Sequence, residues 1–219
     1  MFFGKILAIG GLGMSVHTGT QLDAYQENAD DLTLDVSSSN RVPFVGSAFI
    51  YFDVIPADLV MEYSFEVRGE PVDVNLTYEL ENIQKNYNED LFTFRQSHYL
   101  TIKKDLFSFS IPFLAKTGLY LGGGINSHNT ISPSINLLTK LMNDVTPNEL
   151  IDAIETNQLD YNISNIMDYA DKVNGAHIQA GVQAKLFTFN MFINARYTLL
   201  KTQNSQGFSD LSIGLAFGI

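Results

Sequence analysis

The feature that most constrains this chain is a strict alternation of apolar residues with polar or small ones, repeated in segments of about ten residues. A period of two places successive side chains on opposite faces of a β-strand, so each segment predicts a strand with one apolar face. The final segment shows the pattern most cleanly: Leu211, Ile213, Leu215, Phe217 and Ile219 alternate with Ser212, Gly214, Ala216 and Gly218. The sequence therefore predicts an all-β protein.

The alternation predicts eight strands, at about residues 6–17, 44–54, 59–68, 91–103, 111–126, 176–186, 189–200 and 211–219. The pattern changes parity after Gly69-Glu70-Pro71, which we interpret as a bulge or a bend. Dividing the strand there, and adding one at residues 106–114, would give ten strands instead.

The first strand has an alternative interpretation. Lys5 and the apolar residues that follow it could form a signal peptide, with Gly13-Met14-Ser15 as its cleavage site. We favour a strand, because removing this segment would leave an odd number of strands. A targeting signal upstream of Met1 is then expected.

Long polar connections alternate with short ones along the chain. Residues 19–42, 69–90, 127–175 and 201–209 form the long connections, whereas those near 55–58, 104–110 and 187–188 are short. This asymmetry is typical of an up-and-down barrel in an outer membrane, which has short periplasmic turns and longer extracellular loops.

The third long loop has a helical period, which predicts a helical insertion over residues 132–174. Ser132 or Ser134 could cap a first helix that runs to Asn143, and Thr146-Pro147-Asn148-Glu149 has the features of a second helix start. A third helical piece is expected at about residues 164–173. The apolar residues that we expect to make contacts in this insertion are Leu138, Leu141, Met142, Leu150, Ile154, Ile166 and Met167.

Charge placement favours a membrane barrel over a soluble one. Only 17% of the residues are charged, and the apolar faces of the strands carry almost none of them. A lipid-facing surface requires this, because Lys or Arg at the middle of a membrane costs about 2–4 kcal/mol. The interior of an eight-stranded barrel is just filled by side chains, so the inward charges should pair with one another. The residues expected in this lumen network are Asp53, Glu62, Glu66, Arg68, Arg95, Lys116, Lys185 and Arg196.

Three segments resemble a known family. They are residues 111–127 (IPFLAKTGLYLGGGINS), 176–200 (AHIQAGVQAKLFTFNMFINARYTLL) and 210–219 (DLSIGLAFGI). They resemble the small outer-membrane β-barrel domains of the OmpA/OmpX/OmpW type, although the chain ends in Ile219 with Phe217 as its aromatic residue. The resemblance implies one domain over residues 1–219, an eight-stranded antiparallel up-and-down transmembrane barrel, and location in a bacterial outer membrane. It also implies contact with outer-membrane lipids and recognition by the barrel-assembly machinery.

Composition excludes several function classes. The chain has no cysteine, which excludes disulfides and thiol chemistry, and its net charge of −11 argues against nucleic-acid binding. No spacing of the four histidines favours a metal site, and we expect no cofactor. Ser15 and His17 share one strand face, as a serine–histidine pair in a lipid-modifying enzyme would, but the sequence assigns no carboxylate to orient the histidine.

The expected function is therefore non-enzymatic: a scaffold that displays its helical loop to an envelope or extracellular protein partner. The first alternative is a narrow channel for small or hydrophobic solutes, lined by the inward charges. A second alternative is a lipid-modifying enzyme that uses Ser15 and His17.

Overall fold

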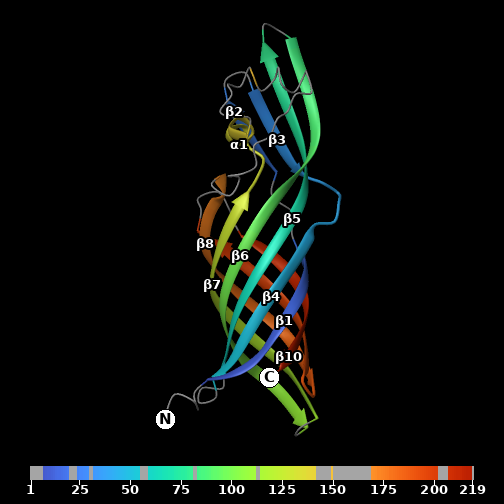
Figure 1. Cartoon of the computed structure of the whole chain (residues 1–219), viewed down its shortest axis with the longest axis vertical. Coiled ribbons are helices and arrows are strands. Elements are labelled where there is room, and N and C mark those ends of the chain that lie inside the picture. The colour runs from blue at the N-terminus through green and yellow to red at the C-terminus, as the bar shows by residue number, and fades with distance from the viewer. Residues whose placement is uncertain are drawn as a thin grey trace.

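The computed structural model describes residues 7–19, 24–29, 32–54, 59–80, 83–111, 114–141, 149, 169–201 and 207–218. The molecule is elongated: a barrel forms one end, and a smaller group of strands with a short helix forms the other (Figure 1). The first strand of the chain begins, and the last strand ends, at the barrel end (Figure 1).

Within the described ranges, eight antiparallel strands close the barrel in the order β5-β4-β1-β10-β9-β8-β7-β6, with β6 pairing back to β5. Around the ring, each strand pairs with its neighbours in chain order, apart from the hairpin inserted between β1 and β4, and the last strand pairs with the first. The strands are β1 (Leu7–Gly19), β4 (Phe44–Val54), β5 (Leu59–Leu80), β6 (Ile83–Ile111), β7 (Ala115–Ile131), β8 (Asp171–Leu186), β9 (Phe189–Leu200) and β10 (Phe208–Gly218).

The register of the ring is staggered by ten residues. A path that leaves β9 at Leu199 and crosses each strand to its paired residue passes through Tyr63 on β5 and returns to β9 at Phe189. A stagger of this kind requires strands tilted by roughly 35–45° from the barrel axis, and eight such strands enclose a lumen that side chains can fill.

The apolar face of each barrel strand points outward. Met14 on β1 is 73% exposed, Ile178 on β8 61% and Leu215 on β10 59%. The residues that alternate with the apolar ones along each of these strands point into the lumen. An apolar surface that continues around a whole barrel is far larger than a water-soluble monomer exposes, and it is the surface that a lipid bilayer covers. The soluble-barrel alternative, with its apolar side inward, does not match this arrangement.

The segment from Lys5 to Ser15, for which a signal peptide was the alternative, forms part of strand β1 from Leu7 onward. Residues 11–19 of β1 pair with β10, and residues 7–16 pair with β4, with one irregularity between Ile9 and Gly11. The strand is therefore part of the ring: as the first barrel strand of the chain, β1 pairs with the last one, β10, and with β4.

The second part of the molecule, which we call the head, lies beyond the barrel at the end away from the termini (Figure 1). It contains β2 (Tyr25–Ala29), β3 (Leu32–Ser38), α1 (Ile135–Leu141) and the distal parts of β5 and β6. One edge of β5 pairs with β4 over residues 59–69 and with β3 over residues 72–78. The sheet therefore continues from the barrel into the head without interruption. Buried residues of its core are Leu32, Leu34, Val36, Val72, Val74, Leu76 and Ile135.

The predicted bulge at Gly69-Glu70-Pro71 is wrong. The pairing of β5 with β6 runs in one register from Leu59 to Leu80, so the same strand face continues through this point. Glu66 and Val72 both lie on the inner face, but that face changes from polar to apolar there. Inside the membrane the inner face meets a polar lumen, whereas in the head it meets the apolar core, and this change of surroundings explains the change of parity.

Two predicted long loops are also corrected. Residues 69–90 are mostly strand, because the β5–β6 hairpin continues as far as the Leu80–Ile83 pair. Residues 19–42 contain the β2–β3 hairpin, which accounts for two strands of the ten in the described sheet. The ring itself keeps eight strands, so the alternative of ten barrel strands by division at residue 69 does not hold.

Candidate functional site

Arg196 on β9, Asp210 on β10 and Glu66 on β5 form an ion network in the barrel lumen. The Arg196 guanidinium donates through Nε to Asp210 Oδ2 at 2.8 Å and through Nη2 to Glu66 Oε2 at 2.7 Å. The Arg196 side chain is 6% exposed and both carboxylates are 1% exposed. Because β5 lies opposite β9 in the ring, the network joins opposite walls of the barrel.

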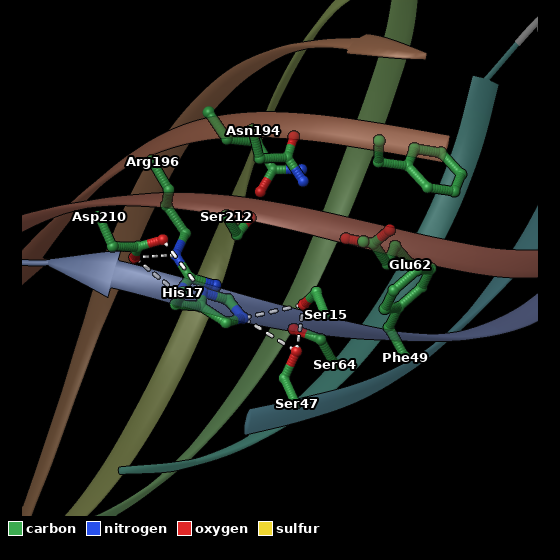
Figure 2. A pocket seen from close by; sticks show the side chains of 13 residues that line it. Ser15, His17, Ser47, Phe49, Glu62, Ser64, Asn194, Arg196, Asp210 and Ser212 are labelled. Atoms are coloured by element: carbon green, nitrogen blue, oxygen red, sulfur yellow. Dashed lines mark hydrogen bonds and ion pairs between the residues drawn. The ribbon is translucent and has the colours of Figure 1, made fainter. Parts of the chain in front are cut away.

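His17 on β1 extends this network to two serines. Its Nδ1 lies 3.3 Å from Asp210 Oδ1 and 3.6 Å from Glu66 Oε2. Its Nε2 lies 2.9 Å from Ser15 Oγ and equally far from Ser47 Oγ on β4. Figure 2 shows the histidine between the carboxylate of Asp210 on one side and the two hydroxyls on the other.

Ser15, His17 and Asp210 thus have the order of contacts of a serine–histidine–aspartate triad. The sequence did not assign the carboxylate, because Asp210 stands 193 positions from His17 and reaches it only through closure of β1 on β10. The cavity beside these side chains measures about 20 Å³, which is room for about one water molecule. An acyl substrate does not fit in that space, so the geometry places these side chains as an enclosed polar network.

Aromatic residues close the lumen on the side of the chain termini. Phe49, Tyr51, Tyr120 and Phe192 are all buried and form one cluster with Ala216. The rings of Phe49 and Phe192 meet edge to face with their centroids 5.6 Å apart. The polar ends of the tyrosines are satisfied within the lumen: Tyr120 donates to the Asn194 side chain, and the Asn190 side chain donates to Tyr51.

Lys103 on β6 lies against this aromatic cluster. Its amino group pairs with Glu62 on β5 and lies 4.9 Å from the centre of the Tyr120 ring and 5.4 Å from that of Phe192. Both charged side chains are buried. A lysine among aromatic rings gains a cation–π contact in addition to its ion pair, which stabilises the closure.

A second aromatic group packs against the ion network. The Tyr99 ring meets the rings of His128 and His177 edge to face, at centroid distances of 5.4 and 5.2 Å. The Arg196 guanidinium lies 3.7 Å from the centre of the Tyr99 ring. His128 also bonds Ser97 at 2.8 Å, so each residue in this group is held by its neighbours.

The structure gives the other predicted network residues different contacts. Arg68 pairs with Glu70 at 3.9 Å, the Arg95 guanidinium lies 4.2 Å above the Phe208 ring, and Lys116 pairs with Asp105 at 2.5 Å. Lys185 lines a hollow at the end of the barrel near the termini. Asp53 belongs to β4, but its side chain lies outside the described ones.

Sequence reasoning missed Lys103, Asp105 and Asp210. All three share the polar parity of their strands, which was the available signal. Lys103 and Asp210 lie at the ends of the strands expected from the sequence, where the alternation indicated no facing direction. The bonds between strands could not be deduced, because they depend on which strands become neighbours.

Of the predicted loop contacts, Leu138 packs against the head core from α1. Ser134 caps this helix through its hydroxyl, which accepts from the Leu137 amide at 3.0 Å, as one of the two predicted caps. The Leu141 side chain and all of Met142, Leu150, Ile154, Ile166 and Met167 lie outside the described residues. The helical insertion is thus seen as one short helix, and its remainder stays a prediction.

Tyr25 fastens the β2–β3 hairpin to the chain that leads into α1. Its hydroxyl donates to the carbonyl of Pro133, and the neighbouring Glu27 carboxylate accepts from the Ile135 amide at 3.0 Å. Burial, together with the charges of Glu27 and Asp171, raises the pKa of Tyr25 to about 12. The phenol is therefore neutral and able to donate throughout the physiological range.

No group of three or more His, Asp or Glu side chains among the described residues is arranged to hold a metal ion. None of the helices in the described ranges combines the length and the apolar character that crossing a membrane would require.

No model of a known protein family and no curated protein matches this chain. Among solved structures, the N-terminal β-barrel domain of Pseudomonas aeruginosa OprF is 10% identical, with a TM-score of 0.42 over 96% of this chain and 98% of that chain. Ail, the attachment invasion locus protein of Yersinia pestis, in complex with the heparin analogue sucrose octasulfate, is 10% identical, with a TM-score of 0.43 over 98% and 99%. The beta domain of the Bordetella autotransporter BrkA is 8% identical, with a TM-score of 0.35 over 95% and 98%.

These TM-scores lie below 0.5. The evidence for the fold and for its location in a membrane is therefore the strand pairing of this chain, the apolar outer surface of its barrel and the polar lumen. Antiparallel barrels with an apolar exterior and a polar interior are the form that β-proteins take in the bacterial outer membrane. The chain is an outer-membrane β-barrel.

Proposed function

We propose that this protein is a non-conducting scaffold that holds its head rigidly outside the cell for contact with a partner. The observation that carries this proposal is the closure of the lumen by side chains at successive levels. The periplasmic level is the cluster around Phe192, and the next is the Arg196 network together with the aromatic group around Tyr99 that packs against it.

Two small hollows lie inside the barrel among the described residues. The hollow at the Arg196 network measures about 20 Å³, and the one at the periplasmic mouth measures about 100 Å³. Phe192 lines both of them, and its ring contacts that of Phe49 at the upper one. A hydrated ion needs a continuous aqueous path, and these levels interrupt it.

The head supports a role in display. A barrel strand needs only about 9–11 residues to cross a membrane, whereas β5 has 22 and β6 has 29. The surplus continues the barrel sheet into the head and packs with β3 and α1 over its own apolar core. A surface built on a continuous sheet keeps its orientation, which favours recognition of a partner because little order is lost on binding.

The chemistry of the lumen supports a non-enzymatic role, since the hydroxyl of Ser15 faces a cavity of about 20 Å³ and not a substrate groove. We propose that the head meets an envelope or extracellular protein. We also propose that the barrel is inserted by the assembly machinery that serves this class of protein and is surrounded by outer-membrane lipids.

The test is the single-channel conductance of the refolded protein in a planar bilayer. We expect the native protein to be silent, and the double variant Phe192→Ala with Tyr120→Ala to stay silent as well, because the Arg196 network and the group around Tyr99 still close the lumen after the periplasmic cluster is removed. Heat-dependent mobility on a gel serves as the folding control for both. Steady current through the native protein that changes on Lys103→Gln would support the channel alternative instead.

Deletion of residues 132–174 separates the remaining outcomes. A protein that stays silent after the deletion has a filled barrel, as proposed. Current that appears only after the deletion would mean that the third loop gates a real pore, and it would contradict the proposed closure by the lumen side chains.

A further inference from the structure

One edge of β6 is open in the head, where β5 and β6 reach farther from the barrel than the other strands (Figure 1). Pairing of β6 with β7 starts only at Phe94, opposite Ile131, whereas its pairing with β5 continues as far as Ile83. Residues 83–93 therefore have a neighbouring strand on one side only among the described residues. β7 does not follow them, because the chain passes through Pro133, which has no amide hydrogen, and enters α1.

This open edge lacks two usual protections of an exposed strand, a bulge and a proline. The register of β6 against β5 has no irregularity between residues 83 and 93, and the segment contains no proline. Such an edge offers the unpaired N–H and C=O groups of its backbone to another strand. The side chains along the edge then decide which strand fits.

The sequence of the edge is complementary to itself about Tyr87. When two copies pair antiparallel with Tyr87 at the centre, apolar residues oppose apolar ones, opposite charges meet, and amides oppose amides or a carboxylate. The opposed pairs are Ile83 with Leu91, Gln84 with Asp90, Lys85 with Glu89, and Asn86 with Asn88. Pairs of these kinds directly across two strands stabilise a sheet.

The two faces of the edge match in the same arrangement. Tyr87 and Leu91 pack against the head core on the inner face, whereas Asn86 and Asn88 are exposed on the outer face. Directly opposed residues of an antiparallel pair lie on one face of the sheet. Two copies would therefore join their head sheets into one, with both cores on the same side and Tyr87 beside its counterpart on the two-fold axis.

Charge makes the edge more suitable for a second copy than for a foreign strand. Glu89 is exposed, and no cation among the described side chains lies within ion-pair distance of it. A strand without the same spacing of charges would not match Glu89 and Lys85 together, and that mismatch disfavours it. A second copy supplies both opposite charges at the required spacing.

The direction of the strand decides where the second copy lies. In every copy β6 runs from the head towards the barrel, so two copies in one membrane have β6 strands that descend in the same sense. Strands tilted by roughly 35–45° from the barrel axis then cross at no more than about 90°, and they cannot lie antiparallel. Antiparallel pairing reverses the barrel axis, which requires that the second copy stands in a facing membrane.

We propose that residues 83–91 form a homophilic contact site, at which the head pairs antiparallel with the head of a second copy in an opposing membrane. This contact rests on the display of the head in the proposed function and names its partner. The two can fail separately: current through the native protein would contradict the closed lumen alone, and vesicles that do not cluster would contradict the contact alone.

Vesicle clustering tests the contact. Refolded protein is inserted into preformed phosphatidylcholine vesicles, so that the polar head remains outside, and two vesicle populations carry different dyes. Light scattering and two-colour coincidence then measure the vesicles held together. Native protein should cluster the vesicles, and clustering no greater than that of protein-free vesicles would overturn the proposal.

Exchange of charges tests the register. Lys85→Glu puts like charges opposite Glu89, and Glu89→Lys puts like charges opposite Lys85. The protein density at which each variant clusters with itself should therefore rise about ten-fold. Mixing vesicles of the two variants restores opposite charges at both positions and should return clustering to the native level, which also shows that both variants are folded.

Asp73→Lys is the matched control, because it makes the same change of charge as Glu89→Lys on β5, between β3 and β6 and away from the open edge. It should cluster like the native protein. A loss in the control equal to that in the edge variants, or a mixture without rescue, would overturn the proposal.

A single cysteine gives a second measurement, since the chain has none of its own. Directly opposed cysteines on antiparallel strands lie within reach of a disulfide. Tyr87→Cys stands opposite itself and should yield a linked dimer on oxidation with copper phenanthroline, whereas Asn88→Cys stands opposite Asn86 and should not. Equal linkage of the two variants would contradict the register.

Discussion

Replacing Arg196 with methionine tests the ion network that joins opposite walls of the barrel. The substitution keeps most of the side-chain volume but leaves Glu66 and Asp210 buried without the guanidinium that bonds them at 2.7 and 2.8 Å. Removing one partner of a buried ion network costs about 3–5 kcal/mol. The loss should lie towards the upper end of this range, because the contact with the Tyr99 ring at 3.7 Å disappears as well.

The assay is urea unfolding of the refolded protein in lipid vesicles, followed by circular dichroism and by gel mobility. Lys116→Met is the matched control: its pair with Asp105 is 41% and 18% exposed, so its loss should cost no more than about 1 kcal/mol. Adding Glu66→Gln and Asp210→Asn to Arg196→Met should restore most of the stability, because no uncompensated charge remains. Equal losses in Arg196→Met and Lys116→Met, or no recovery in the triple variant, would refute the reasoning.

Two further predictions concern the apolar outer surface of the barrel and the head. Leu100→Arg, on the lipid-facing side of β6, should lower the free energy of unfolding by about 2–4 kcal/mol, whereas Gln96→Arg, nearer the head on the same face, should cost at most about 1 kcal/mol in the same assay. Equal losses of unfolding free energy in the two variants would mean that Leu100 does not lie deeper in the membrane than Gln96. Because burial favours the neutral phenol of Tyr25, with Glu27 and Asp171 adding to the effect, its contribution to head stability should be complete below pH 10 and lost as the pH rises towards the pKa of about 12. Hydrogen exchange of the β2–β3 amides across this pH range, compared with Tyr25→Phe, measures the loss, and an unchanged difference up to pH 12 would contradict it.

Several elements of the barrel could be deduced from the sequence because their signal is local. The last strand alternates residue by residue from Leu211 to Phe217, and the structure places those apolar residues outward as one face. The cap at Ser134 is likewise local, since a helix start depends on three or four consecutive residues. These features needed no knowledge of neighbouring strands.

The head was misjudged for a physical reason. Residues 72–80 alternate as cleanly as the barrel strands do, but there the apolar residues face inward on the strand face that was polar at Glu66. Alternation shows that the two faces of a strand differ in polarity. It does not show whether each face meets lipid, water, the lumen or an apolar core. A change from lipid outside to water outside therefore looks like a change of register when only the sequence is read.

The candidate site divides in the same way. The sequence by itself determined which residues share a strand face. It therefore placed Ser15 on the same face as His17 and showed that the apolar strand faces carry almost no charged residues. Only the tertiary structure decided that Asp210 joins His17, that Arg196 reaches Glu66, and that the lumen is closed around Phe192. The physical reason is range: alternation arises within one strand, whereas ring closure and its stagger bring together residues that are far apart in the chain.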